Sequence, residues 1–237
     1  MGTSQAHILK SGPNWSEAKR AVTNIAKNNG KVSSNCSKLM HGLANAIGGN
    51  SYTSGSLGHA GARVSKNFVG FIGAVKSNGY SGILDLLQIG NEQALLTKDD
   101  FIERVIVYVS GNHNSTEDDA AAIIAIEKLL NTICSDCVTV EDIVVMLQSA
   151  SNDNIVEWII FFEVEYILEY SGELFQSHIL DKSEEPEKVM SEIRNWMHRE
   201  IDERIGNKLY PHNFSSPEGK QVLDELTTTT ILDIWKQ

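Results

Sequence analysis

The sequence predicts an all-α protein, a compact multi-helix domain that follows a flexible N-terminal tail. Apolar residues recur at spacings of three and four along most of the chain, which is the period of a helix buried on one side. Only four prolines occur in 237 residues, so long helices are seldom interrupted. No long stretch alternates apolar and polar residues as a strand would. The hydrophobic content of 41% suffices for a sizeable core.

The first 13 residues show no periodicity and end in Gly12-Pro13. We therefore predict a mobile tail over 1–13 and a single helical domain over 14–237. Met1 precedes Gly2, and an initiator Met is commonly removed before so small a residue, which would leave Gly2 with a free amine. An ordinary disordered terminus has the same appearance.

Two short helices are expected to follow the tail. The first begins at Trp15 after a capping Asn14 and stops at the Asn-Asn-Gly of 28–30. The second begins at 34–35 and ends before the two glycines of 48–49. Each carries an apolar stripe at helical spacing, so we expect both to be buried on one side.

The segment 58–75 is predicted to be the central helix. Its apolar stripe comprises Val64, Phe68, Phe71 and Val75. Small residues keep the rest of its surface thin, and they are Gly61, Ala62, Gly70, Gly73 and Ala74. Each mid-helix Gly costs about 1 kcal/mol relative to Ala, so we expect neighbours to pack on this helix nearly backbone to backbone. The polar loop before it, 50–57, lacks the spacing of a phosphate-binding loop, and we assign it no nucleotide.

A break at 79–82 and a short helix over 83–89 follow the central helix. Thr97 caps the next helix, with Asp99 and Asp100 in its favourable first turn. The residues expected on its apolar stripe are Phe101, Val105 and Tyr108.

Two further capping signals occur in the middle of the chain. The residues at 115–118 resemble a capping box that opens a helix to about Thr132. Thr139, with Asp142 three residues later, opens the next helix.

The C-terminal half is predicted to contain a second long apolar helix over 154–179, with a bend at 171–172. Four acidic residues mark its wetter side, namely Glu157, Glu163, Glu165 and Glu169. A charged connector over 181–188 leads to a helix over 187–205, and a last helix starts at 216–217.

Charge is distributed unevenly along the chain, whose net charge is −11. Residues 1–80 hold nine basic residues, one acidic residue and 12 of the 18 glycines, whereas the rest holds 11 basic and 30 acidic residues. We therefore distinguish a basic, Gly-rich part (14–80) from an acidic part (81–237). The basic layer either packs on the acidic one or binds an acidic protein or nucleic acid. The candidate basic contact surface comprises Lys19, Arg20, Arg63 and Lys66.

The candidate reactive groups are better interpreted as structural. Cys134 and Cys137 form a CxxC without further Cys or His at ligand spacing, and we expect buried or semi-exposed thiols. Three histidines lack a nucleophile motif, namely His178, His198 and His212. The acidic residues of 154–179 lack the ExxH spacing of a di-iron site and are assigned to a solvated face. We therefore predict a chain that is not an enzyme and has neither cofactor nor metal.

No run of about 18 uncharged apolar residues occurs, so we predict no membrane contact. The first residues lack the apolar core of a signal peptide, and the chain has only three cysteines. These features favour a reducing, cytoplasmic location.

Short segments near the N-terminus resemble a known family. In chain order they are Met1-Gly2-Thr3-Ser4, Pro13-Asn14-Trp15-Ser16 with Ala18-Lys19-Arg20, and Gly58-His59-Ala60-Gly61-Ala62-Arg63 with Phe68-Val69-Gly70-Phe71. Together with the acidic helical remainder, including 101–107, they resemble the QatB family of the four-gene Qat anti-phage defence systems. The proline-rich tail often found in that family is reduced here to Gly12-Pro13.

The resemblance implies a non-catalytic adaptor with three kinds of partner: an AAA-like ATPase, a QueC-like enzyme of deazapurine chemistry and a TatD-like nuclease. QueC-like enzymes of defence operons can join a deazapurine to an N-terminal glycine. Gly2, or Gly12 exposed by cleavage, would then be the modified residue. Thr3 and Ser4 would offer hydrogen bonds to the enzyme without bulk.

Two other functions remain open at this stage. The chain could be a helical scaffold or oligomerisation protein whose tail is unmodified. It could also be a nucleic-acid-binding module that uses its basic N-terminal third, in which case binding would weaken steeply with salt.

Overall fold

The computed structural model describes residues 13–27, 33–47, 59–90, 96–111, 113, 115–180, 182–206, 216, 218–219 and 221. Across these residues the regular structure is helical and contains no strand, which confirms the all-α prediction. The predicted tail lies outside the described residues except for Pro13, and so does most of the predicted last helix. None of the described helices combines the length and the apolar character that crossing a membrane requires.

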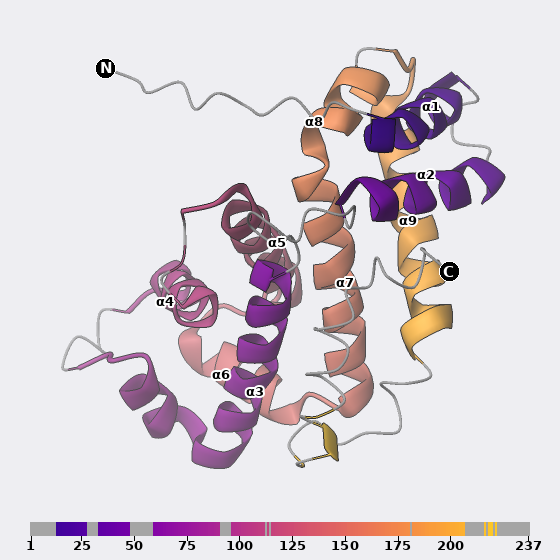
Figure 1. Cartoon of the computed structure of the whole chain (residues 1–237). Helices are drawn as coiled ribbons and strands as arrows, with labels where there is room; N and C mark the ends of the chain where they lie inside the picture. The colour runs from indigo at the N-terminus through magenta and orange to yellow at the C-terminus, as the bar shows by residue number, and fades with distance from the viewer. Residues whose placement is uncertain are drawn as a thin grey trace. The chain divides into compact units, whose positions relative to one another are not determined.

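Among the described residues the helical elements are all α-helices, except that α8 and α9 each lead into a π-helical turn (η). In chain order they are α1 (Pro13–Lys27), α2 (Ser33–Ile47), α3 (His59–Leu86), α4 (Lys98–Ser110), α5 (Glu117–Ile133), α6 (Val140–Ser149), α7 (Asn152–Tyr170), α8 (Gly172–Phe175), η2 (Gln176–Leu180), α9 (Pro186–Ile201) and η3 (Asp202–Gly206) (Figure 1).

The chain divides into two compact units. The first contains α1, α2, α8, η2 and α9 up to Met197, and the second contains α3 to α7 and the described residues from His198 onward. The boundary between the basic and acidic parts, near residue 80, falls within α3 and so within the second unit. A single domain over 14–237 therefore stays a prediction.

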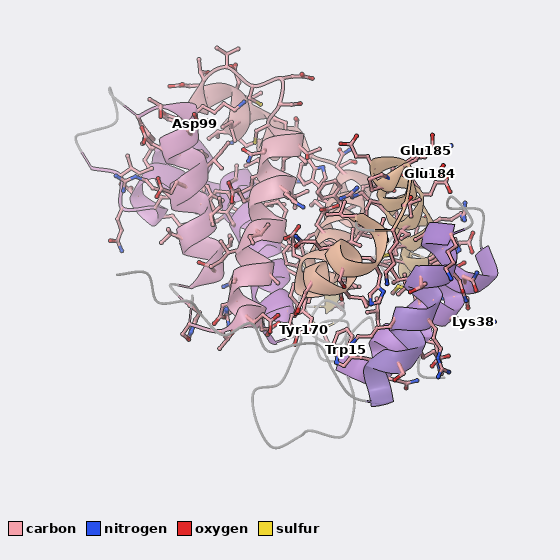
Figure 2. The ribbon with its side chains drawn as sticks, turned by 90° about the horizontal axis from the view of Figure 1, so that it is seen from above. Trp15, Lys38, Asp99, Tyr170, Glu184 and Glu185 are labelled. Atoms are coloured by element: carbon pink, nitrogen blue, oxygen red, sulfur yellow. The ribbon has the colours of Figure 1, made fainter. Side chains whose placement is uncertain are left out.

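In the first unit α1 and α2 pack closely against each other. A Cβ added at Gly42 would lie 2.5 Å from the backbone nitrogen of Ala18, so the two backbones approach each other where Gly42 has no side chain. Trp15 is buried at the first turn of α1, whereas Lys38 on α2 is exposed (Figure 2). Because α1 begins at Pro13, Asn14 lies inside the helix rather than capping it. Proline suits this first turn because its missing N–H has no intrahelical partner to lose.

In the second unit α3 is the central helix, as predicted, and it contacts α4, α5, α6 and α7 (Figure 1). The predicted stripe is confirmed, because its four residues are at most 2% exposed: Val64, Phe68, Phe71 and Val75. The predicted break takes the form of a kink at Gly79, with φ 64° and ψ −163°. The helix then resumes and ends at Leu86 rather than at Ile89.

The expected close approach to α3 is found at one glycine and not at another. A Cβ added at Gly61 would lie 2.7 Å from Cε1 of Tyr166, so this glycine makes room for an aromatic ring of α7. A Cβ added at Gly70 would meet nothing within 4 Å. The expectation of backbone contact is therefore wrong at Gly70, which faces open space, and Gly61 meets a side chain rather than a backbone.

Two predicted helix starts are confirmed in detail. At α4 the Thr97 hydroxyl accepts from the Asp100 N–H at 3.1 Å, and the Asp100 carboxylate accepts from the Thr97 N–H at 3.2 Å. Thr139 and Asp142 make the same reciprocal pair at α6, at 3.1 and 2.8 Å. Each pair satisfies two backbone N–H groups that a helix start otherwise leaves without partners.

The capping box of α5 lies one residue later than predicted. Thr116 is the cap and Asp119 its partner, rather than Ser115 and Asp118. The carboxylate of Asp118 instead accepts the N–H of Ala60 at 3.0 Å, at the start of α3. The neighbouring acids therefore serve the starts of two different helices.

The predicted helix over 154–179 is divided where a bend was expected. α7 ends at Tyr170, and α8 and η2 follow from Gly172 to Leu180. Ser171 lies at the junction and is fully buried. The predicted helix over 187–205 is α9, which begins one residue earlier and ends at Ile201, with η3 continuing to Gly206.

Candidate functional site

The residues predicted to be modified or to bind the partner enzyme lie outside the described residues: Gly2, Thr3, Ser4 and Gly12. The predicted basic contact residues fall in both units. Lys19 and Arg20 are on α1, in the first unit, and Arg63 and Lys66 are on α3, in the second. Arg20 and Lys66 are exposed, whereas Lys19 and Arg63 are partly buried.

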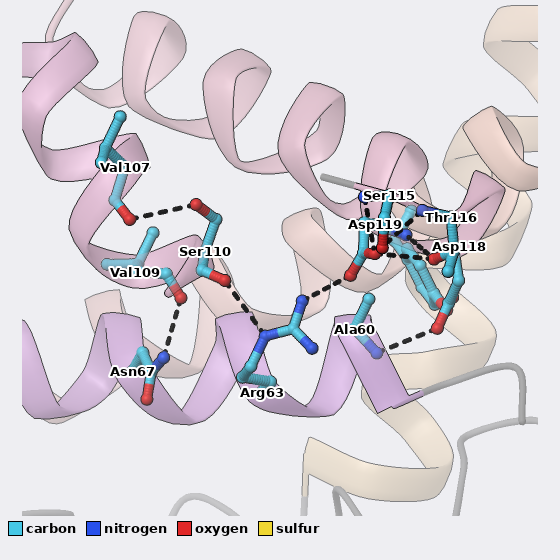
Figure 3. Close-up of polar contacts among 11 residues, drawn as sticks. Ala60, Arg63, Asn67, Val107, Val109, Ser110, Ser115, Thr116, Asp118 and Asp119 are labelled. Carbon is cyan, nitrogen blue, oxygen red and sulfur yellow. Dashed lines mark hydrogen bonds and ion pairs between the residues drawn. The ribbon is translucent and has the colours of Figure 1, made fainter. Parts of the chain in front are cut away.

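Arg63 joins α3 to the two helices that pack beside it (Figure 3). Its Nη2 lies 2.7 Å from Oδ1 of Asp119, and its Nε donates to the carbonyl oxygen of Ser110 at 3.1 Å. The Arg63 side chain is 28% exposed and that of Asp119 is 7% exposed. The guanidinium is therefore engaged within the second unit, and a contact surface at Arg63 stays a prediction.

The same face of α3 also caps the C-terminus of α4. The last carbonyl groups of a helix lack intrahelical donors. Arg63 supplies a donor to Ser110, and the Asn67 side chain donates to the carbonyl of Val109 at 2.8 Å (Figure 3). The positive charge of Arg63 is favourable at the negative end of the helix dipole. Gly111 ends α4 in a left-handed conformation with φ 66°.

Asp119 is ionised because its hydrogen bonds favour the charged form. It accepts from the backbone N–H groups of Ser115 and Thr116 and from the Thr116 hydroxyl. Burial acts to raise the pKa of Asp119, but the hydrogen bonds from Arg63 and Thr116 outweigh it and hold the pKa below its ordinary value. An ionised carboxylate therefore faces the guanidinium.

Residues 60–63, part of the segment 58–63 that contributes to the family resemblance, pack α3 against α5 and α7. Asp118 accepts the N–H of Ala60 and also the hydroxyl of Tyr166, whose ring occupies the space left by Gly61. Arg63 pairs with Asp119. The small residues and the arginine of this segment thus fix α3 against α5 and α7.

The prediction of a solvated acidic face on α7 is wrong for Glu165. That residue is 2% exposed and pairs with Lys128 of α5 at 3.0 Å. Lys128 also pairs with Glu169, and these contacts outweigh the opposing effect of burial and raise the pKa of Lys128. Glu165 is therefore buried as an ion pair, with its cation supplied by the neighbouring helix α5.

Glu163 is only partly exposed, which also departs from the predicted solvated face. Its carboxylate accepts a hydrogen bond from the Ser65 hydroxyl at 3.0 Å. Burial raises the pKa of Glu163 to about 7, and the hydrogen bond opposes the shift only in part. Glu163 therefore changes charge near neutral pH.

The cysteines are buried or half-buried, as predicted. Burial raises the pKa of Cys134 to about 12, so its thiol stays protonated, which disfavours nucleophilic or metal chemistry. The ammonium of Lys98 donates to the carbonyl oxygens of Cys134 and Cys137 at 2.6 and 2.9 Å. Within the described ranges, no group of three or more Cys, His, Asp or Glu side chains could hold a metal ion.

Two of the predicted histidines, His178 and His198, contact neighbouring side chains. His198 lies 3.2 Å from the carboxylate of Glu157. His178 lies 3.1 Å from both the Thr23 hydroxyl and the Lys182 ammonium. His212 lies outside the described residues.

The outer face of α4 carries exposed apolar side chains beside two hollows. Val107 is 47% exposed and Tyr108 is 39% exposed, although the ring of Tyr108 also lies 5.9 Å from that of Phe71 on α3. A hollow of about 730 Å³ lies between the end of α3 and α4, and it includes Val107 and Tyr108. A second hollow of about 740 Å³, here called the α4–α5 groove, is lined by Asp99, Ile102, Glu103, Ile106, Val107, Ser110, His113, Ile123, Glu127 and Asn131.

The α4–α5 groove is acidic as well as apolar. Among the described residues, Asp99, Glu103 and Glu127 have no ion-pair partner, and Asp99 lies at the first turn of α4 (Figure 2). Like charges at Asp99 and Glu103, four residues apart, destabilise a helix by about 0.2–0.5 kcal/mol. Lys98 pairs with neither of them, because its ammonium donates to the backbone carbonyls of Cys134 and Cys137. The groove therefore presents carboxylates that pair with no side chain among the described residues.

Sequence reasoning overlooked this groove, although a signal was present. Residues 105–109 are five consecutive apolar residues on a helix. Such a run covers more than one side of a helix, so part of it must face something other than the core. Glu103 and Val107, one turn apart, mark that outer side.

No protein-family model matches this chain, and neither a curated protein nor a solved structure matches it.

Proposed function

We propose that this chain is a non-catalytic interaction protein that holds partner proteins through its helical surface. The observation that carries this proposal is the outer face of α4, where Val107 and Tyr108 are exposed beside two hollows. Apolar side chains at the edge of a hollow, rimmed by polar groups, are typical of protein-binding surfaces. This coarser function does not depend on the family resemblance.

The finer proposal is an adaptor and substrate of a bacterial anti-phage defence complex in the cytoplasm. The tail glycine, Gly2 or a Gly12 exposed by cleavage, is modified by a QueC-like partner, and an AAA-like ATPase and a TatD-like nuclease complete the complex. The three QatB-like segments occur in the expected order, which supports this proposal. A glycine amine is also an unhindered acceptor for an enzyme that joins a base to an N-terminus.

The test of the finer proposal uses the tagged full chain co-expressed with its genomic neighbours. We expect the neighbours to co-purify with it and an added mass on an N-terminal glycine. Gly2→Val should abolish the modification and the phage defence if Gly2 is the acceptor, while the far-UV circular dichroism stays unchanged. Gly12→Val is the matched control and should leave both unchanged in that case, or lose both if Gly12 is the acceptor.

Unchanged modification in both variants would sink the assignment of these two glycines. Absence of any co-purifying neighbour, with an unmodified terminus, would contradict the adaptor role and favour a self-contained helical scaffold. Binding of short DNA or RNA with a steep salt dependence would favour the nucleic-acid alternative.

A further inference from the structure

We propose that the α4–α5 groove binds a basic amphipathic segment of a partner protein, with a Lys or Arg of the partner at its acidic end and an apolar side chain at its other end. This inference deepens the proposed interaction role and rests on it, because it names the surface and the chemistry of the partner. Both sides of the groove belong to the second unit.

The acidic end of the groove is built from both helices. Glu103 of α4 and Glu127 of α5 both line it, and Asp99 lies one turn before Glu103. Glu103 and Glu127 are exposed and lie within their helices, so neither is needed to cap a helix start. Without an ion-pair partner among the described residues, these carboxylates are available to a cation from outside.

The apolar end lies one turn further along α4. Val107 is 47% exposed, and Ile106 and Ile123 line the groove beside it. Glu103 and Val107 are four residues apart, so they are separated by about 6 Å along the helix axis. A partner helix that carries a Lys or Arg and a Leu one turn apart on a single face matches this spacing.

Charge complementarity selects this occupant over others. The groove carries three carboxylates, whereas its lining offers no Lys or Arg. An acidic segment or a nucleic acid would be repelled there, and a purely apolar one would leave the carboxylates beside an uncharged surface. Arg104 lines the other hollow together with Asp100. The pKa of Asp100 is lowered mainly by hydrogen bonds with Thr97 and, to a smaller extent, by the charge of Arg104.

The test measures binding of two labelled peptides to the full chain by fluorescence anisotropy. One is a 16-residue helix with Leu and Lys one turn apart on one face, and its twin carries Glu in place of each Lys. We expect the Lys peptide to bind at least about tenfold more tightly at low salt, with the difference shrinking towards 1 M NaCl. The double variant Glu103→Lys with Glu127→Lys should reverse the preference in favour of the Glu twin.

An apolar variant tests the other end of the groove. Val107→Asp should weaken binding of the Lys peptide about tenfold or more, because it removes the apolar anchor. The matched control is Val145→Asp on α6, where Val145 is 63% exposed. A second control, Glu141→Lys with Glu184→Lys, makes the same change in net charge at exposed positions outside the groove. Both controls should bind like the wild type.

Equal binding of the two peptides, or an unreversed preference in the double variant, overturns the proposal. A wild-type dimer that Val107→Asp dissociates, measured by light scattering, also overturns it, because a second copy would then occupy the groove. Failure of peptide binding while genomic neighbours still co-purify removes this surface and leaves the interaction role in place. If no genomic neighbour co-purifies with the wild-type chain, the interaction role itself is contradicted.

Discussion

Replacing Arg63 with Met removes a side chain that ties α3 to both α4 and α5. Asp119 loses a charged donor at 2.7 Å, and the Ser110 carbonyl loses a donor at 3.1 Å. A hydrogen bond to a charged group contributes about 2 kcal/mol and an ordinary one about 1 kcal/mol, and the 28% exposure of Arg63 keeps the loss from being larger. We expect the free energy of unfolding to fall by about 3 kcal/mol, or the melting temperature by about 6–12 °C.

The assay is urea unfolding followed by circular dichroism, with amide hydrogen exchange in α3 and α5 as a local measure. Lys38→Met is the matched control, because Lys38 is exposed on α2 and its replacement should change stability by less than about 0.5 kcal/mol. Equal stability of the two variants would refute the role assigned to Arg63.

The pH dependence provides a second check on this pair. The pKa of Asp119 is depressed in the folded protein, because hydrogen bonds from Arg63 and Thr116 outweigh the opposing effect of burial. Its contribution to stability is therefore present above the ordinary Asp pKa of about 3.9 and is lost as the pH falls through the folded value. The difference between wild type and Arg63→Met should shrink below about pH 4. An unchanged difference at lower pH would show that the charged pair is not its source.

Three further results are expected from the packing of single residues. Burial raises the pKa of Glu163 to about 7, so the contribution of Glu163 to the free energy of unfolding is lost as the pH rises from about 4.5 towards 7. Glu163→Gln should remove this pH dependence, and a urea midpoint whose pH profile is the same in the variant as in the wild type would contradict it. Gly42→Ala should destabilise the first unit by about 1–3 kcal/mol, because its Cβ would lie 2.5 Å from the Ala18 backbone. A Cβ at position 70 would face open space, so Gly70→Ala should stabilise α3 by up to about 1 kcal/mol. A higher melting temperature for Gly42→Ala than for Gly70→Ala would contradict this packing.

The helices could be predicted from the sequence because their determinants are local. The periodic stripe of α3 and the capping residues Thr97 and Thr139 act within one or two turns of the chain. The shift at α5 could not be predicted, because Asp118 is drawn to Ala60, 58 residues away in sequence. Local rules cannot choose between two neighbouring acids when a distant helix start binds one of them.

The surface was harder to predict than the core. A helical stripe identifies an apolar residue, but whether that residue is covered depends on which helices lie beside it. Tyr108 shares the spacing of the buried stripe of α4 and is nonetheless 39% exposed. Glu165 stands among acidic residues and is nonetheless buried against Lys128. Both outcomes depend on packing between helices that are distant in sequence.

The measurement that most directly tests the proposed function is the mass of the intact chain and of its N-terminal peptide, after expression with and without its genomic neighbours. We expect an added mass on Gly2, or on a newly exposed Gly12, that depends on a QueC-like neighbour. A terminus that stays unmodified under every condition would contradict the proposed role as a modified adaptor.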